Sequence, residues 1–107
     1  MNVNGVEFPL DAIRVLCENH GIARLSLFGS ILRPASNEDG SGFRPSSDID
    51  LLVEFLPGRT PGLIAISGVQ LELQALLGRA VDLRTPKELS RFFRDDVQRM
   101  AVPLHAA

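Results

Sequence analysis

Apolar residues recur along this chain with two alternating periods, that of helices and that of strands. Three short apolar runs have the length and composition of β-strands, at residues 22–28, 48–55 and 80–84. Apolar residues at helical spacing occupy the segments around these runs, at residues 9–20, 63–77 and 89–100. This alternation of helices and strands predicts one layered α/β domain over residues 1–107, without an internal repeat.

Residues at the ends of the predicted helices support these boundaries. Gly21 and Gly78 follow the first two helical stripes, where glycine commonly ends a helix. Thr60-Pro61 is typical of an N-cap followed by a proline in the first turn. The segment 85–88 has the spacing of a capping box. The last helix, or pair of short helices, is expected to have this apolar face: Leu89, Phe92, Phe93, Val97 and Met100.

Two carboxylates, Asp48 and Asp50, lie at the start of the second strand. Residues i and i+2 of a strand share one face, so both side chains should point the same way, with Cα atoms roughly 6–7 Å apart. Neighbouring acidic groups on a packed strand repel each other and lose hydration. A divalent cation such as Mg²⁺ or Mn²⁺ would remove both penalties. The residues alone equally allow Asp48 to cap the strand while Asp50 is solvated.

Gly29-Ser30 directly follows the first strand. Glycine allows a ligand to approach the backbone closely. The N–H and hydroxyl of Ser30 can donate to phosphate oxygens if a helical turn begins there, and Arg33 can supply a guanidinium to the same anion. Most Gly-Ser pairs are only turns. Beside paired carboxylates, however, such a phosphate cradle is half of a nucleoside triphosphate site.

Residues 28–33 read Phe-Gly-Ser-Ile-Leu-Arg, and residues 47–55 read Ser-Asp-Ile-Asp-Leu-Leu-Val-Glu-Phe. Together they resemble the minimal nucleotidyltransferases of the polymerase-β-like superfamily, and within it the MntA-type antitoxins that partner HEPN-domain toxins. Further segments resemble signatures of the same family, at residues 57–63, 76–86 and 101–104. The resemblance extends over nearly the whole chain and implies the nucleotidyltransferase fold, a small mixed β-sheet flanked by helices.

The family places a third carboxylate on another strand, and Asp82 occupies the matching position. Taken alone, Asp82 would be read as an acidic residue on the exposed face of a strand. The resemblance implies a site with these members: the catalytic and metal-binding Asp48, Asp50 and Asp82, and the nucleotide-binding Gly29, Ser30 and Arg33. It further implies two Mg²⁺ ions, with Mn²⁺ as a substitute, and ATP as the nucleotide donor.

The implied reaction is transfer of AMP from ATP to a tyrosine hydroxyl of a partner HEPN toxin, which would make the protein an antitoxin. The alternative is a non-catalytic antitoxin that neutralises its partner by forming a complex. A third reading, adenylylation of a small molecule such as an aminoglycoside, is disfavoured because no second domain is visible to build its pocket. The sequence does not identify the acceptor independently of the resemblance.

The chain departs from the family pattern between the two halves of this site. Residues 34–46 form a longer link than usual, and their polar, Gly- and Ser-containing composition predicts a flexible inserted surface loop. A longer loop adds little closure entropy, so the fold should tolerate it. Ile31-Leu32 also replaces a position where the family often has a basic residue. Both features favour the non-catalytic alternative.

Composition narrows the remaining function classes. A net charge of −2, from 11 basic and 13 acidic residues, argues against direct nucleic-acid binding, which needs a basic field. No apolar run is long enough to cross a bilayer, and the N-terminus lacks a signal-peptide pattern, so we expect a cytoplasmic protein. The single Cys17 lies on the apolar stripe of the first helix and is expected to be a buried small hydrophobe. Phe92 and Phe93 are read as core residues, or alternatively as partner-facing.

Overall fold

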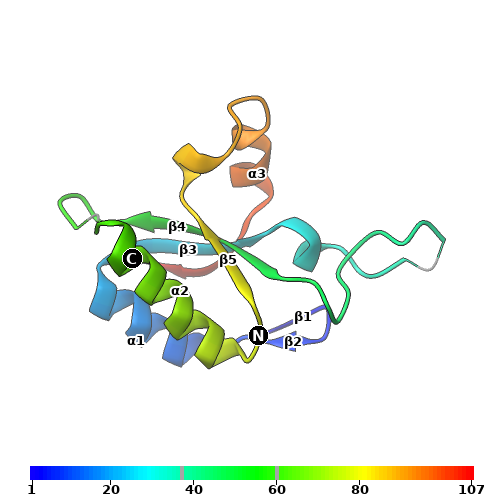
Figure 1. The fold of residues 1–107 in the computed structure, drawn as a ribbon, viewed down its shortest axis with the longest axis horizontal. Helices are drawn as coiled ribbons and strands as arrows, with labels where there is room; N and C mark the ends of the chain where they lie inside the picture. Colours follow the sequence, from blue (N-terminus) through cyan, green and yellow to red (C-terminus); the bar gives the residue numbers. More distant parts are fainter. Residues whose placement is uncertain (37, 60) are drawn as a thin grey trace.

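The computed structural model describes residues 1–36, 38–59 and 61–107. Its centre is a four-stranded sheet in the order β5-β4-β3-β6 (Figure 1). The strands are β3 (Ile22–Phe28), β4 (Ile49–Phe55), β5 (Val81–Arg84) and β6 (Val102–Ala106). β4 runs parallel to β5, whereas β3 pairs antiparallel with both β4 and β6. The sheet is therefore mixed, and the prediction of an α/β fold with a mixed sheet is confirmed.

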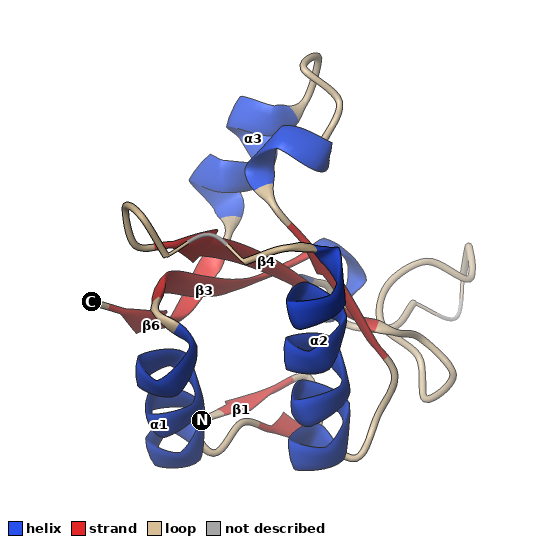
Figure 2. Ribbon diagram, turned by 60° about the vertical axis from the view of Figure 1, so that its left-hand side comes forward, coloured by secondary structure: helices blue, strands red, loops and turns tan. Residues whose placement is uncertain are grey.

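Two helices, α1 (Leu10–His20) and α2 (Leu63–Leu77), cover one face of the sheet, and α3 (Arg94–Met100) lies on the opposite side (Figure 2). Short 3₁₀ turns follow two of the strands, η1 (Gly29–Leu32) after β3 and η2 (Pro86–Glu88) after β5. A small hairpin of β1 (Asn2–Val3) and β2 (Val6–Glu7) precedes α1. Among the described residues, no helix is long and apolar enough to span a bilayer.

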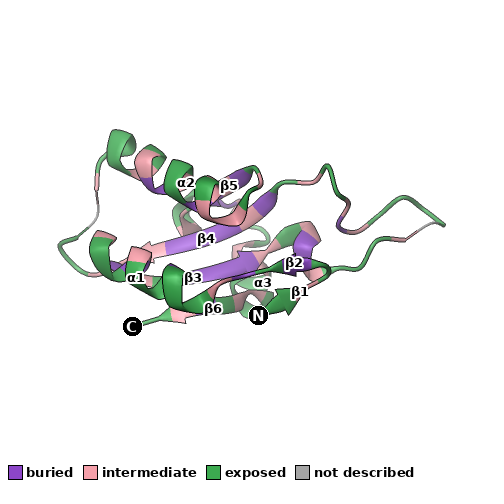
Figure 3. Cartoon of the chain, turned by 90° about the horizontal axis from the view of Figure 1, so that it is seen from below, coloured by how far each residue is buried: buried purple, intermediate pink, exposed green. Residues whose placement is uncertain are grey.

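The hydrophobic core lies between the sheet and the helices α1 and α2 (Figure 3). The central strand β4 contributes its alternate residues, because side chains i and i+2 share one face. The fully buried positions on it are Ile49, Leu51 and Val53. The helices contribute Ile13, Cys17, Val69 and Leu73. The face of β4 that was predicted to be apolar is therefore the core face, and Asp50 lies on the other one.

Gly21 and Gly78 end their helices as predicted, and both adopt a left-handed conformation, with φ of 67° at Gly21 and 66° at Gly78. The predicted start of α2 was wrong, because the helix begins at Leu63 with Gly62 as its N-cap. Pro61 precedes the helix and does not occupy its first turn. Thr60, the other half of that prediction, lies outside the described residues. The predicted capping box at residues 85–88 is present and opens η2.

The segment after β5 differs most from its prediction. Regular helix begins only at Arg94, and much of the predicted apolar face is exposed. Phe92 is 82%, Phe93 52% and Met100 70% exposed, so the reading of the two phenylalanines as core residues was wrong. Leu89 is buried as expected. The stripe has helical spacing, but residues 89–93 lie before the regular helix, so the members of the stripe do not share one helical face.

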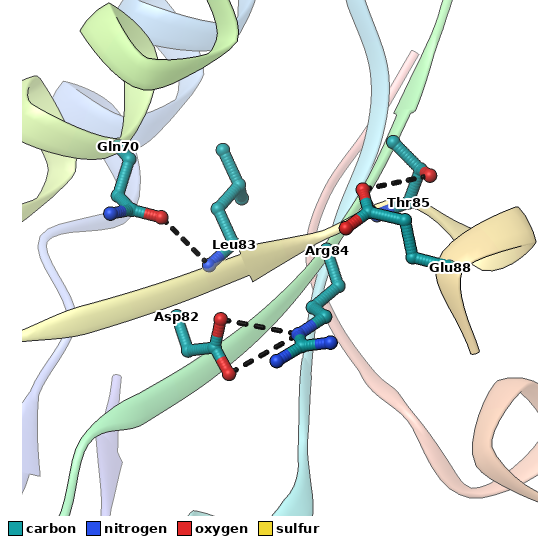
Figure 4. A network of polar contacts seen from close by, with 6 residues as sticks. All are labelled: Gln70, Asp82, Leu83, Arg84, Thr85 and Glu88. Atoms are coloured by element: carbon teal, nitrogen blue, oxygen red, sulfur yellow. Dashed lines mark hydrogen bonds and ion pairs between the residues drawn. The ribbon is translucent and has the colours of Figure 1, made fainter. Parts of the chain in front are cut away.

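Two glutamines of α2 cover the outer edge of β5, which is an edge strand of the sheet. The Oε1 atom of Gln74 accepts the backbone N–H of Val81 at 3.2 Å, and that of Gln70 accepts the N–H of Leu83 at 3.2 Å (Figure 4). Gln70 and Gln74 lie one helical turn apart, which matches the spacing of alternate N–H groups along the strand. This pairing fixes α2 against the strand that carries Asp82.

The described residues of the inserted segment, 34–36 and 38–46, extend away from the sheet (Figure 1). Phe43 is only 7% exposed and belongs to the core cluster. Its backbone N–H donates to the carbonyl of Arg33 at 2.9 Å. The Nη2 atom of Arg44 donates to the carbonyl of Ser36 at 2.6 Å. The burial of Phe43 differs from the predicted surface loop, and the flexibility of the inserted segment stays a prediction.

Candidate active site

The site is built on the register of two parallel strands. Asp50 of β4 is the direct partner of Asp82 of β5, so their Cα atoms lie side by side and their side chains share one face. On its other side Asp50 pairs with Phe28, the last residue of β3. Asp48 precedes β4 and is exposed. The strand order thus brings the carboxylates of Asp50 and Asp82 together near the end of β3, which Gly29 and Ser30 follow.

Gly29 packs directly against the carboxylate of Asp50. Its φ is +76°, a conformation that favours glycine, and a Cβ added there would lie 2.3 Å from Oδ2 of Asp50. Glycine therefore serves two purposes at this point, the left-handed turn into η1 and the close approach of the carboxylate. Ser30, the second residue of η1, follows immediately. The proposed phosphate-binding turn and the proposed metal-binding carboxylate are in contact.

Asp50 has a raised pKa, which distinguishes it from the other carboxylates that the structure describes. Burial raises the pKa of Asp50 above its ordinary value, and the negative charges of Asp82 and then Asp48 raise it further. Arg84 and the backbone N–H of Ser30 lower that pKa but do not offset the increase. The charges of Asp82 and Asp48 are therefore close enough to oppose the ionisation of Asp50. Perturbation of this kind is typical of functional sites.

Arg84 is a site residue that sequence reasoning missed. Its Nε atom lies 3.2 and 3.3 Å from the two carboxylate oxygens of Asp82, and this ion pair raises the pKa of Arg84 (Figure 4). The signal was available, since residues 82 and 84 are two apart on one strand and share a face. Both side chains are partly exposed, so the pair adds little stability.

Arg33 lies beside these groups rather than among them. It is exposed at the end of η1 and borders a cavity of about 320 Å³. The cavity has a largely apolar lining, composed of Phe28, Gly29, Leu32, Arg33, Asp96, Val97 and Met100. Its volume is at the lower end of the range for small-molecule sites. Gly29 belongs both to this cavity and to the contact with Asp50, so the two features are continuous.

The side chains of the site have only part of what the implied metal needs. Within the described residues, no three acidic, histidine or cysteine side chains are close enough to form a complete metal site. The adjoining carboxylates of Asp50 and Asp82 nevertheless supply only oxygen donors, and Arg84 and the backbone N–H of Ser30 offset only part of their repulsion. Hard oxygen donors with unbalanced negative charge suit Mg²⁺ or Mn²⁺. The chemistry of the residues fits the ion, and their role as ligands stays a prediction.

A mixed sheet with a Gly-Ser turn beside paired carboxylates defines a nucleotidyltransferase-type fold. Residues 11–103 match the nucleotidyltransferase domain family, and the chain belongs to that family. This match includes every predicted site residue. The family therefore confirms the predicted fold and the predicted class of enzyme.

Two relatives share much of the sequence. MJ0435 of Methanocaldococcus jannaschii, provisionally named a protein adenylyltransferase, is 32% identical over 102 residues, which cover 95% of this chain and 97% of the relative. The protein adenylyltransferase MntA of Thermococcus cleftensis is 37% identical over 68 residues, or 64% of this chain and 60% of MntA.

Solved structures of similar proteins have the same fold. One described provisionally as a minimal nucleotidyltransferase has a TM-score of 0.64 at 38% identity, covering 88% of this chain and 87% of the other. The fold also matches a complex of the MNT antitoxin with the tri-AMPylated HEPN toxin of Shewanella oneidensis, at a TM-score of 0.60 and 22% identity. That match covers 92% of this chain and 70% of the other, and at this identity what it shows is the shared fold.

Proposed function

We propose that this protein transfers AMP from ATP to a tyrosine hydroxyl of a partner HEPN toxin and thereby acts as its antitoxin. The observation that carries the proposal is the contact between Gly29 and the Asp50 carboxylate, which in turn pairs in register with Asp82. A phosphate-binding turn touching paired carboxylates is the arrangement that phosphoryl-group chemistry requires. The names of the two relatives support adenylyl transfer, and the complex with an AMPylated HEPN toxin supports the kind of acceptor.

In the proposed reaction the acceptor oxygen attacks the α-phosphorus of ATP, and the bond to the β-phosphate oxygen breaks as pyrophosphate leaves. Gly29 and Ser30 hold the β- and γ-phosphates, with the Ser30 hydroxyl as a donor, and Arg33 offsets their charge. Asp82 accepts the proton of the acceptor hydroxyl. The close approach at Gly29 keeps the triphosphate next to Asp50.

Asp48, Asp50 and Asp82 are the residues that would hold Mg²⁺ in this scheme. Two such ions would neutralise the triphosphate and lower the pKa of the acceptor hydroxyl. Arg84 is paired with Asp82 and reduces the repulsion between the carboxylates. The proposed site of action is the cytoplasm, where ATP and Mg²⁺ are available together.

The test mixes the protein with ATP labelled on the α-phosphate, Mg²⁺ and the product of the neighbouring gene. We expect label to appear on that partner, and Asp50→Asn or Asp82→Asn to reduce the rate by at least 100-fold, because each change removes a charged ligand. Asp11→Asn, which changes an exposed carboxylate on α1, is the matched control and should retain the full rate.

A second outcome would support the non-catalytic alternative. In that case the partner would be bound tightly and inhibited without receiving label, and Asp50→Asn would bind as well as the unaltered protein. The absence of a complete metal cluster among the described residues and the length of the 34–46 segment are the features that favour this alternative.

A further inference from the structure

Arg79 connects two segments that are far apart in the sequence. It lies between α2 and β5, one residue after the Gly78 that ends the helix. Its Nη2 atom donates to the carbonyl oxygen of Pro45 at 2.6 Å, with longer contacts to those of Arg44 at 3.3 Å and Ser47 at 3.4 Å. Its guanidinium also lies over the ring of Phe43, 4.8 Å from the centroid. One side chain thus binds the backbone directly before Asp48.

The backbone that Arg79 binds is a closed turn. The N–H of Ser47 donates to the carbonyl of Arg44 at 2.9 Å, and the N–H of Arg44 donates to Oγ of Ser47 at 3.0 Å. These bonds bring the carbonyls of the turn to one side, where they face the guanidinium. Asp48 is the next residue, so the direction in which the chain leaves this turn decides where its carboxylate points.

We propose that Arg79 is a positioning residue that sets Asp48 and the start of β4 against β5. The proposal rests on the proposed function. Immediately after Arg79, the carbonyl of Ala80 accepts the N–H of Ile49 at 2.9 Å, and this bond starts the parallel ladder. The pairing of Asp50 with Asp82 follows one residue further along that ladder. Arg79 and this bond together determine how the carboxylates on both strands meet.

Arginine suits this role better than lysine. A planar guanidinium can stack on an aromatic ring and donate in its own plane at the same time, whereas an ammonium is a point charge without a stacking face. Among the described residues Arg79 forms no ion pair, and its buried Nε has no hydrogen-bond partner. Its interactions are therefore with backbone carbonyls and one ring, which serve to place the backbone.

The test is Arg79→Lys, with Arg14→Lys as the matched control. Arg14 forms an exposed ion pair with Glu18 on α1, remote from the turn. Mn²⁺ binding to the nucleotide-free protein is measured by electron paramagnetic resonance, at a temperature where circular dichroism shows all variants folded. We expect Arg79→Lys to weaken Mn²⁺ binding roughly 10-fold, the usual effect of removing a group that orients a metal ligand, and Arg14→Lys to leave it unchanged.

A second measurement separates positioning from general stability. If Arg79 acts through Asp48, then Arg79→Lys has little further effect on Mn²⁺ binding in an Asp48→Asn background, because the ligand it orients is already lost. Phe43→Leu keeps an apolar side chain but removes the stacking face, and it should weaken Mn²⁺ binding in the same direction by a smaller factor.

The outcomes distinguish this inference from the proposed function. Equal Mn²⁺ affinity in the unaltered protein and folded Arg79→Lys would overturn the positioning role, even if AMP transfer is observed. Additive effects of Arg79→Lys and Asp48→Asn would also overturn it. A weakened Mn²⁺ site in a protein that transfers no AMP would support the positioning role and refute the transferase. If the unaltered protein binds no Mn²⁺ without nucleotide, the positioning role is overturned, whereas the transfer of AMP to the partner still decides the proposed function separately.

Discussion

Gly29→Ala tests the contact on which the proposed site is built. An alanine Cβ would lie 2.3 Å from Oδ2 of Asp50, whereas ordinary contact begins near 3.4 Å. The carboxylate or the turn must therefore shift by about 1.1 Å, the difference between these distances. A displacement of about 1 Å at reacting groups reduces rates by roughly 100-fold. The positive φ adds a backbone penalty of about 1–2 kcal/mol, which lowers stability.

Gly58→Ala provides the control for this substitution. Gly58 has the same φ of +76°, but an added Cβ there would meet nothing within 4 Å. Both variants should therefore lose the stability that the positive φ costs, roughly 4–16 °C in melting temperature if 1 kcal/mol corresponds to about 4–8 °C, and the displaced carboxylate should lower the melting temperature of Gly29→Ala further. Only Gly29→Ala should lose activity. The difference between the two variants isolates the displaced carboxylate from backbone strain.

The assay is transfer of labelled AMP to the partner, measured below the melting temperature of both variants. Thermal unfolding followed by circular dichroism gives the stability of each variant. If Gly29→Ala transfers AMP as fast as Gly58→Ala, the Gly29 contact does not hold a catalytic carboxylate and the argument is refuted. A large loss in both variants would show that backbone strain, and not the carboxylate, controls the rate.

Three further predictions concern stability and reactivity. Because the pKa of Asp50 is raised above its ordinary 3.8, its neutral form favours folding below that pH and the benefit is lost as pH rises through the folded-state pKa. Asp50→Asn should therefore melt higher than the unaltered protein at pH 7.5 but not at pH 3.5, and equal melting at both would contradict the assigned repulsion. Burial raises the pKa of Cys17 to about 11, so an aromatic disulfide reagent at pH 8 should react only as fast as the chain unfolds, and rapid labelling of folded protein would refute its burial. Gln70→Ala should reduce the free energy of unfolding by about 1 kcal/mol, because the N–H of Leu83 loses its acceptor. Gln98→Ala changes an exposed glutamine on α3 and is the control, which should melt like the unaltered protein. Equal melting temperatures for Gln70→Ala and Gln98→Ala would argue against the hydrogen bond between Gln70 and Leu83.

The central fold was predictable because its elements combine clear periodicity with clear ends. β3 matches its predicted bounds, and β4 differs by one residue. The short elements were missed for physical reasons. Residues 102–106 contain Pro103, which argues against a strand because proline cannot donate to the ladder. The hairpin of β1 and β2 is too short for periodicity, although Asn4-Gly5 at its turn is a recognised hairpin signal.

The candidate site was predictable only in part. The family pattern indicated Asp82, and parallel pairing in the structure explains why it lies beside Asp50. Arg84 was within reach of the same period-2 argument and was overlooked. Arg79 could not be found this way, because its partners are backbone carbonyls more than 30 residues earlier in the chain. Contacts between a side chain and a distant backbone leave no pattern in sequence spacing.

The glutamine cover on β5 also limits how the sheet can grow. Gln70 and Gln74 occupy the outward N–H groups of β5, and at the opposite edge Pro103 of β6 has no N–H to offer. An extended peptide or a second copy of the chain therefore finds no continuous row of free backbone donors at either margin. This arrangement protects a small open sheet from edge-to-edge pairing with strands of other chains. It also implies that a docking protein is recognised through side chains rather than by strand addition.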